Sequence, residues 1–342
     1  MPDTATPLAP PLVAPPAIDT RVTRLLGIRY PIVQGGLARV ATAELAAAVS
    51  NAGGLGQIAS AGTGQDGAGG LCSPDDLRAL IRRCRALTSR PFGVNIPIGR
   101  SAVEPVLEVA LEERVPVIAL TAGNPAPYIR RCEGSGARIL VLTAGPELAR
   151  KAEAAGADMV ATVGYEGGGH LGRGDETTLV MVPRVVAAVR IPVLASGGIA
   201  DGRGLLAALA LGAEGVEVGT RFVATTEARA HEHYKQALAA ARPEDTRIIK
   251  RTLGTPGRVL ASAHVERILA AEAAGAGKEA ILPMVLGEVN GAGSDRGDLE
   301  NSFVWAGQSV GLIEAVEPAG EVVRRMAAEA AAGMARLRSC FA

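Results

Sequence analysis

One histidine stands among glycines, where its imidazole could do chemistry. His170 lies in VGYEGGGHLGRGDETTL, residues 163–179, and is one of only four histidines in the chain. An imidazole can transfer protons or bind an anion near neutral pH, and glycines let the backbone pass close beside a flat ligand. A histidine in a polar loop can also be merely solvated. We therefore ask which other groups accompany it.

Two glycine clusters predict a phosphate site. They occur in LASGGIADGRGLLAAL and GVEVGTRF, each at the end of a predicted strand. Backbone N–H groups at such turns can approach a phosphate, and the helix that follows adds the positive end of its dipole. The alternative is that the glycines only make tight turns. Two clusters on successive strands favour phosphate, with Gly197, Gly198, Gly219 and Thr220 as its ligands.

Two further strand ends carry groups suited to a planar ring. The segment YPIVQGGLARV places Gln34, Gly35 and Gly36 after the first strand, and FGVNIP places Asn95 on the third. Amide side chains can address the heteroatom edge of a ring, while bare glycine lets the ring lie against the backbone. Asn95 alone could equally serve a turn. Beside a phosphate site, these residues predict a flat, phosphorylated cofactor.

A match to the dinucleotide fingerprint is interpreted as a mobile loop. GTGQDG, residues 62–67, has the glycine spacing, but more glycine follows where a helix should begin. The next helix is expected to start later, at SPDD, with Ser73 as cap, Pro74 in the first position and Asp76 closing a capping box.

Other polar residues near the histidines are given structural roles. His231 and His233 are two residues apart, do not share a helix face, and are expected at the surface. Asp175 and Glu176 could orient His170 or cap the next helix, which is expected to start at Pro183.

Composition excludes several classes of protein. The 342 residues are 48% hydrophobic, which is enough to bury a sizeable core. Lys plus Arg and Asp plus Glu both number 35, so no net charge attracts nucleic acid or a membrane. No apolar run could span a bilayer, and the first residues lack the features of a secretory signal. Four scattered cysteines predict a reduced, cytoplasmic chain with no metal site.

Short apolar runs alternate with alanine-rich amphipathic stretches, which is typical of a parallel sheet wrapped in helices. Eight such units predict an α/β fold, a (β/α)₈ TIM barrel, with a doubly wound open sheet as the alternative. The predicted strands are Pro31–Gln34, Leu55–Ser60, Phe92–Ile96, Val117–Thr121, Arg138–Thr143, Met159–Val163, Val193–Ser196 and Gly215–Gly219.

The repeat stops after Arg221, where two stretches, residues 225–254 and 257–277, are predicted to be helical. The expected organisation is a proline-rich disordered tail over residues 1–20, a barrel over 21–224 plus 303–342, and a small helical subdomain over 225–302.

Taken together, PIVQGGLARVATAELAAAVSNAGGLG, RPFGVNI, EGGGHLG, ASGGIADGRGLLAALALGAEGVEVGTRF and WAGQSVGLI resemble the nitronate monooxygenase family, which includes FMN-dependent enoyl-ACP reductases of the FabK type. The resemblance runs from about Arg21 to the C-terminus. It implies an FMN-bearing barrel in which the SGG and GTR segments hold the phosphate and His170 lies over the flavin as catalytic base or substrate contact. The residues predicted to hold FMN are Gln34, Gly35, Gly36, Leu37, Asn95, Leu142, Gly168, Ser196, Gly197, Gly198, Gly219 and Thr220.

The family resemblance implies oxidation of alkyl nitronates, small molecules, with O₂. An alternative is NAD(P)H-dependent reduction of an enoyl thioester or a quinone, because the QGG motif at residues 34–36 is shared with such reductases. Outside enzymes, the alternative is a barrel that binds a phosphorylated ligand, against which a histidine on the catalytic face argues. A homodimer is left open.

Overall fold

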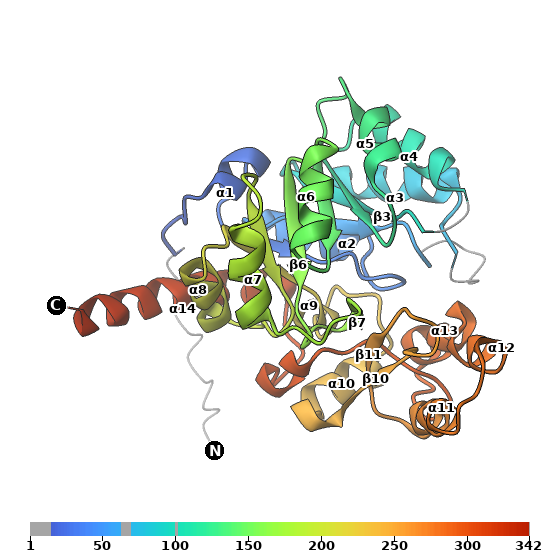
Figure 1. The fold of residues 1–342 in the computed structure, drawn as a ribbon. Coiled ribbons are helices and arrows are strands. Elements are labelled where there is room, and N and C mark those ends of the chain that lie inside the picture. The colour runs from blue at the N-terminus through green and yellow to red at the C-terminus, as the bar shows by residue number, and fades with distance from the viewer. Residues whose placement is uncertain (1–14, 63–69, 100–101, 342) are drawn as a thin grey trace, which may run out of the picture.

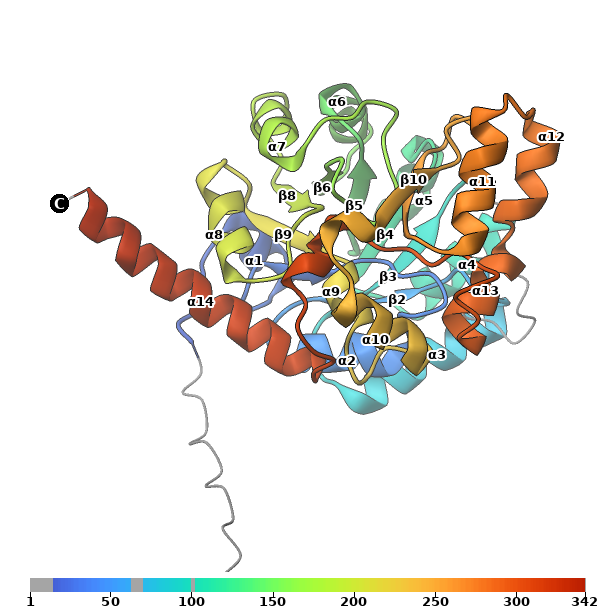
Figure 2. The same cartoon turned by 90° about the horizontal axis from the view of Figure 1, so that it is seen from below.

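A computed structural model describes residues 15–62, 70–99 and 102–341. The predicted barrel is confirmed: eight parallel strands form one sheet in the order β1-β9-β8-β6-β5-β4-β3-β2, with helices outside them (Figures 1 and 2). Each strand agrees with its predicted range to within one residue. They are β1 Ile32–Gln34, β2 Gly56–Ala59, β3 Phe92–Pro97, β4 Val117–Thr121, β5 Arg138–Thr143, β6 Met159–Val163, β8 Val193–Ser196 and β9 Gly215–Val218.

The barrel closes between β1 and β2, where side-chain amides extend a very short ladder. Val33 and Leu55 form a single parallel bridge. Beyond it, Gln34 Oε1 accepts the Gln57 backbone N–H at 2.9 Å, and Gln57 Nε2 donates to the Gln34 carbonyl at 2.9 Å. Both glutamines are fully buried, so these bonds satisfy polar groups that water cannot reach. We call this contact the seam.

The barrel helices bury one face each. In α3 (Pro74–Leu87), Leu77, Ile81 and Cys84 are the buried positions, at the spacing of an amphipathic helix. Its predicted start is confirmed, with the Ser73 hydroxyl accepting the Asp76 N–H at 3.1 Å. The others are α1 Arg21–Leu26, α2 Ala43–Asn51, α4 Val103–Glu112, α5 Ala126–Cys132, α6 Pro146–Ala154, α7 Thr178–Val186, α8 Gly202–Ala210, α9 Thr220–Val223 and α14 Ala319–Cys340.

Two expectations about these elements are corrected. The helix α7 starts at Thr178, not at Pro183, because the Glu166 carboxylate accepts the Thr178 N–H at 2.9 Å and caps the earlier turn. The chain also packs before Arg21: Pro15 is buried, and its carbonyl accepts the Tyr30 hydroxyl at 3.0 Å. Residues 1–14 and 63–69, and with them most of the predicted tail and of the GTGQDG loop, lie outside the described residues.

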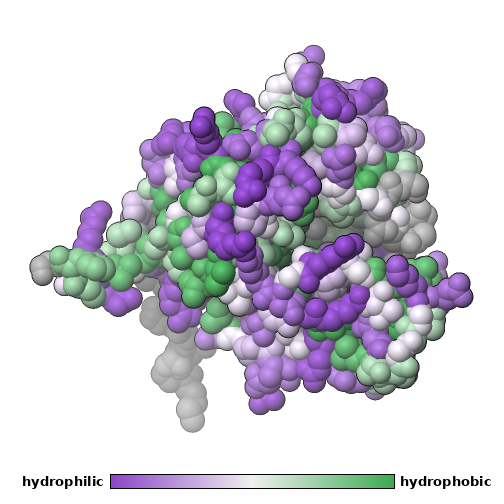
Figure 3. Space-filling view, viewed as in Figure 1, coloured by the Kyte–Doolittle hydropathy of each residue, from purple (hydrophilic) through white to green (hydrophobic). Residues whose placement is uncertain are grey.

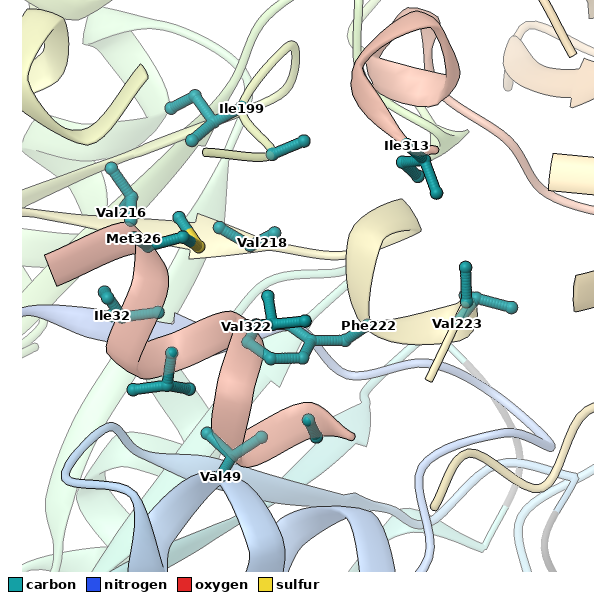
Figure 4. Close-up of a cluster of buried hydrophobic side chains, with 14 of the residues drawn as sticks. Ile32, Val49, Ile199, Val216, Val218, Phe222, Val223, Ile313, Val322 and Met326 are labelled. Carbon is teal, nitrogen blue, oxygen red and sulfur yellow. The ribbon is translucent and has the colours of Figure 1, made fainter. Parts of the chain in front are cut away.

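Hydrophobic side chains fill the barrel and the layer around it. Val33, Leu140, Met159 and Leu194 belong to the interior cluster, together with Val22 and Leu26 of α1. On the outer side, β1 and β9 pack against α2, α8 and α14 through residues that include Ile32, Val216, Val322 and Met326 (Figure 4). The C-terminal part of α14 extends away from the barrel (Figures 1 and 2).

The segment that runs from α10 (Glu232–Ala240) to α13 (Gly287–Arg296) after the last barrel strand contains strands as well as helices, and we call it the subdomain. Two stretches expected to be helical include the strands β10 (Thr246–Ile249) and β11 (Gly257–Leu260), which pair antiparallel. The structure thus corrects that expectation, because β11 also pairs with β7 (Gly169–His170), a partner far away in sequence. The helices are α10 Glu232–Ala240, α11 Ala263–Ala273, α12 Lys278–Ile281 and α13 Gly287–Arg296, with 3₁₀ turns η1 Pro243–Asp245, η2 Leu282–Val285 and η3 Gln308–Leu312.

The subdomain has a small core of its own, built from β10, β11, α11, α12 and Phe303. Its residues are Ile249, Val259, Val265, Ile268, Ile281 and Phe303. The proposed boundaries at residues 225 and 302 stay a prediction. None of the described helices has both the length and the apolar composition that crossing a membrane requires.

The seam generates a prediction about stability. Substituting Gln34→Leu leaves the buried Gln57 N–H without its acceptor, so the free energy of unfolding should fall by about 1–3 kcal/mol. Urea denaturation of the two proteins measures this difference. Gln236→Leu is the control, since the Gln236 amide is exposed and bonds only to Glu232 among the described residues. Equal losses in both variants would contradict a role for Gln34 in closing the barrel.

Candidate active site

Turns distant in sequence meet at the carboxyl ends of the strands, where barrel active sites lie. A Cβ built on Gly36 would lie 2.1 Å from Asn95 Cγ, so the turn after β1 rests directly on β3. A Cβ on Gly168 would lie 2.6 Å from Gly307 N and 3.0 Å from Thr220 Oγ1. Glycine is required at both places because any side chain would occupy space held by another segment.

Unpaired backbone N–H groups gather at the ends of β8 and β9. Gly197 and Gly198 have φ of +93° and +75°, which turn the chain sharply after β8. Among the described residues, the N–H groups of Gly198, Gly219 and Thr220 have no hydrogen-bond acceptor. These three groups are named the N–H cradle. They follow two adjacent strands, and together they offer an anion the donors that a phosphate needs.

The side chains around the N–H cradle are already engaged. Thr220 Oγ1 accepts the Gly307 N–H at 3.0 Å. Arg221 is fully buried and donates to the carbonyls of Ala224 at 2.6 Å and Ala315 at 2.8 Å. The GTR segment can therefore offer a phosphate its backbone, while the Arg221 guanidinium serves to hold α9.

The residues predicted to contact a planar ring differ in whether their side chains already make hydrogen bonds. Asn95 is buried, and its side-chain amide makes no hydrogen bond within the described residues, so it is available to a ligand. Both polar groups of the Gln34 side chain are engaged, one at the seam and one with the Gly35 carbonyl. Leu142 is half-buried in the interior cluster, and Leu37 lies 3.4 Å from the Cβ position of Gly219. Gln34 therefore reaches a cofactor through its backbone only.

A buried carboxyl lies beside this turn. Glu217 is 6% exposed, and its Oε1 lies 3.6 Å from the Cβ position of Gly35. Burial raises the pKa of Glu217 to about 7, while a hydrogen bond from Ser196 acts in the opposite direction. An acid that titrates near neutrality, next to the QGG turn, is a feature that the sequence analysis missed.

His170 is held in a strand. It belongs to β7 and pairs with Gly257 of β11, and the following Leu171 N–H donates to the Pro256 carbonyl at 2.8 Å. Its Nε2 lies 2.8 Å from Lys250 Nζ, and its ring centre lies 4.9 Å from that of Trp305. The imidazole itself is exposed at the rim. The glycines before it thus lead into a strand residue whose backbone position is fixed by pairing with β11.

The neighbouring polar residues have other partners. Asp175 pairs with Arg251 at 3.1 Å, and Glu176 pairs with Arg184, so neither carboxylate orients His170 through these pairs.

Hydrophilic residues gather where the subdomain meets the barrel (Figure 3). His231 caps α10 by accepting the His233 N–H at 3.1 Å, and His233 is exposed.

Buried thiols do not join the site. Burial raises the pKa of Cys84 to about 12 and that of Cys132 to about 11, so neither is a ready nucleophile.

Lys250 and Trp305 are further site residues that the sequence analysis did not single out. The sequence could have pointed to Trp305, since it is the only tryptophan of the chain. Nothing in the sequence pointed to Lys250, because it lies in a stretch with a helical pattern.

Comparisons with known proteins identify a family and a fold for this chain. The family model described as nitronate monooxygenase matches residues 19–106 and 99–329. The nitronate monooxygenase of Pseudomonas aeruginosa is 36% identical over 90% of this chain and 98% of its own. The solved FabK of Thermotoga maritima is 41% identical, with a TM-score of 0.86 over 94% of this chain and 99% of its own. The solved nitroalkane oxidase of Streptomyces ansochromogenes is 33% identical, with a TM-score of 0.79 over 93% and 100%.

The raised pKa of Glu217 predicts how stability depends on pH. Its folded pKa of about 7 exceeds the ordinary 4.5, so protonation favours the folded state. This contribution is complete below about pH 4.5 and is lost as the pH rises through 7. Chemical denaturation of the parent and of Glu217→Gln should show the parent losing up to about 3 kcal/mol relative to the variant over this range. Exposed Glu279→Gln is the control, and parallel pH profiles of the parent and Glu217→Gln would contradict the assignment.

Proposed function

The chain belongs to the nitronate monooxygenase family, and from that premise we propose that it is an FMN-dependent oxidoreductase that oxidises alkyl nitronates with O₂. The observation that carries the proposal is that the glycine segment leading to His170 packs against Thr220 of the N–H cradle. His170 follows two residues after Gly168, whose Cβ position lies 3.0 Å from Thr220 Oγ1. A donor set for a phosphate and an imidazole for the substrate therefore share one rim of the barrel.

The residues present fit an FMN. The family is generally flavin-dependent, and the N–H cradle offers unpaired donors of the kind a terminal phosphate requires. The unpaired amide of Asn95 suits the heteroatom edge of the ring, and the QGG turn allows close approach of a flat group. Leu142 of the barrel interior gives apolar contact. FMN is proposed rather than FAD because these donors form one compact set.

The protein supplies binding, orientation and a place for the substrate. A bound flavin would supply the redox chemistry, by taking electrons from the nitronate and passing them to O₂. His170 contacts the substrate from the subdomain side, where strand pairing with β11 fixes its position. Trp305, tilted by 42° against the imidazole, covers one side of the same place. The remaining FMN-contact residues of the family resemblance are proposed with the same roles.

A second function is favoured by one specific observation. FabK of Thermotoga maritima is 41% identical to this chain, a higher identity than that of the Pseudomonas aeruginosa nitronate monooxygenase. The QGG motif at residues 34–36 is shared with reductases of that type. The alternative is therefore an NAD(P)H-dependent reductase of an enoyl thioester or a quinone on the same FMN barrel.

Retention of the flavin should depend on the turn after β8. Valine disfavours the φ of +75° at Gly198, so Gly198→Val should turn the local N–H groups away from the phosphate and weaken flavin retention by at least about tenfold. Gly134→Val is the matched control. Gly134 has φ of +76° with nothing within 4 Å of a Cβ, so it shares the strain at an exposed place. Flavin occupancy and the thermal midpoint are measured together, and full occupancy in Gly198→Val would remove this turn from the cofactor site.

Anaerobic reduction of the flavin separates the two functions. The oxidised holoenzyme is mixed with an alkyl nitronate, NADH or NADPH, and the flavin absorbance is followed. The nitronate should bleach the flavin, whereas neither nucleotide should do so at a comparable rate. In His170→Ala the same step should slow, by about 10²-fold or more if the imidazole moves a proton, while flavin stays bound. Rapid bleaching by a nucleotide with none by nitronates would establish the reductase instead.

A further inference from the structure

The buried carboxyl of Glu217 points into the barrel. Its neighbours along β9, Val216 and Val218, belong to the outer cluster that packs against α14 (Figure 4). Successive side chains of a strand point to opposite faces, so Glu217 faces the interior. Its register partner on β1 is Val33, which belongs to the interior cluster, and its partner on β8 is Ser196. The carboxyl therefore lies inside the barrel and not between the sheet and the helices.

This carboxyl lies between the two parts of the proposed cofactor site. Glu217 comes two residues before Gly219 of the N–H cradle, and Ser196 beside it comes two residues before Gly198. On the other side, its Oε1 and Cδ lie 3.6 and 3.7 Å from the Cβ position of Gly35. Since Gly35 carries no side chain, that residue cannot shield the carboxyl from a group resting on the QGG turn. The acid therefore lies on the barrel side of the place proposed for the flavin.

The strands on either side of Glu217 present no charge to it. On the interior face, β1 places Val33 and Gly35 beside it, and β8 places Leu194 and Ser196. Three of these residues are apolar, and the fourth contributes a hydroxyl. The hydrogen bond from Ser196 lowers the pKa of Glu217, but it brings no counter-charge.

Cations close in the sequence are engaged elsewhere. Arg221 donates to two backbone carbonyls, and Arg39 pairs with Asp295. Within residues 15–62, 70–99 and 102–341, no lysine or arginine forms an ion pair with Glu217. A buried carboxylate without a counter-charge is costly, which is why burial raises the pKa of Glu217 to about 7.

A second polar group of the barrel interior lacks a partner. Gln57 Oε1 is buried, and no group in the described part of the chain donates a hydrogen bond to it. Gln57 faces the interior because Leu55, two residues earlier, belongs to the interior cluster. Both Gln57 and Glu217 thus place polar atoms inside the barrel on strands that flank β1. Water does not screen such groups, so a change of charge at the rim acts strongly on an acid below it.

We propose that Glu217 sets the reduction potential of the flavin by holding or releasing one proton inside the barrel. The neutral carboxyl permits electrons to enter the cofactor, whereas the carboxylate opposes them, because two negative charges repel strongly at low dielectric. When the carboxylate form is reduced, the electrons come from the nitronate or from an external reductant, and one proton passes from solvent to the Glu217 carboxylate. The inference rests on the proposed FMN but not on the substrate that reduces it.

The pH dependence of the flavin equilibrium tests this role. The holoenzyme is reduced anaerobically against reference dyes from about pH 5 to pH 9, and the absorbances give the ratio of reduced to oxidised flavin. In Glu217→Gln an uncharged amide replaces the acid at every pH. The two profiles should be parallel below about pH 6. By pH 9 the parent should hold about tenfold less reduced flavin relative to the variant, since its acid has ionised with a pKa of about 7.

A second variant and a matched control accompany this measurement. The Ser196 hydrogen bond lowers the pKa of Glu217, so Ser196→Ala should move the start of the divergence to higher pH. This variant carries the test if Glu217→Gln does not fold. Glu279→Gln removes an acid from an exposed position and should follow the parent. Flavin content is checked in each protein.

The outcomes keep this inference apart from the proposed function. Parallel profiles of the parent and Glu217→Gln over the whole range, or an unchanged profile in Ser196→Ala if only that variant folds, would overturn the role of Glu217. If the profiles diverge but no nitronate reduces the flavin, the role of Glu217 stands and the oxidase function fails. If nitronate reduces the flavin while the profiles stay parallel, the function stands and the role of Glu217 fails. A protein that retains no FMN contradicts both.

Discussion

Closure of the barrel between β1 and β2 is the constraint on which the rest of the structure depends. Seven neighbouring pairs of strands are joined by regular parallel ladders. The eighth has one bridge and the exchanged amides of Gln34 and Gln57. A barrel removes its edges only when this last pair is made. The strand β1 also positions the site from its other side, because it pairs with β9 there and the Gly35 N–H of the QGG turn donates to the Val218 carbonyl at 2.9 Å.

The subdomain is attached to that rim, and the position of His170 depends on the attachment. One link is the pairing of β7 with β11. Another is Arg39, just after the QGG turn, whose Nη1 lies 2.5 Å from Asp295 Oδ2 of α13. The Arg39 side chain is 3% exposed, so removing Asp295 would leave a buried charge without this partner, which costs more than the pair itself contributes. These links therefore fix the position of the subdomain relative to the rim of the barrel.

Elements whose cause is local could be predicted from the sequence, whereas those whose partner is remote could not. The eight strands follow from β-branched runs, and the start of α3 follows from Ser73 and Pro74. The strands β10 and β11 are an exception, since they pair with each other locally but lie in stretches with a helical pattern; only the pairing of β11 with β7 joins segments far apart in sequence. The predicted phosphate donors come together on β8 and β9, but the engagement of the Gln34 side chain and the burial of Glu217 arise only from packing. Lys250 could not be found, since its contact with His170 joins segments that are 80 residues apart in the sequence.

Under the proposed function, the site holds its cofactor and its substrate by different means. The phosphate is met by backbone N–H groups of the barrel, which carry no titratable charge and are fixed by the turns after β8 and β9. The substrate is proposed to meet His170, whose position is fixed by the pairing of β7 with β11 and whose ring lies beside that of Trp305. Side chains of a subdomain can change without disturbing the barrel, whereas the backbone cradle cannot. In this chain the proposed cofactor donors therefore belong to the barrel, whereas the position of the residue proposed to meet the substrate depends on the subdomain that pairs with it.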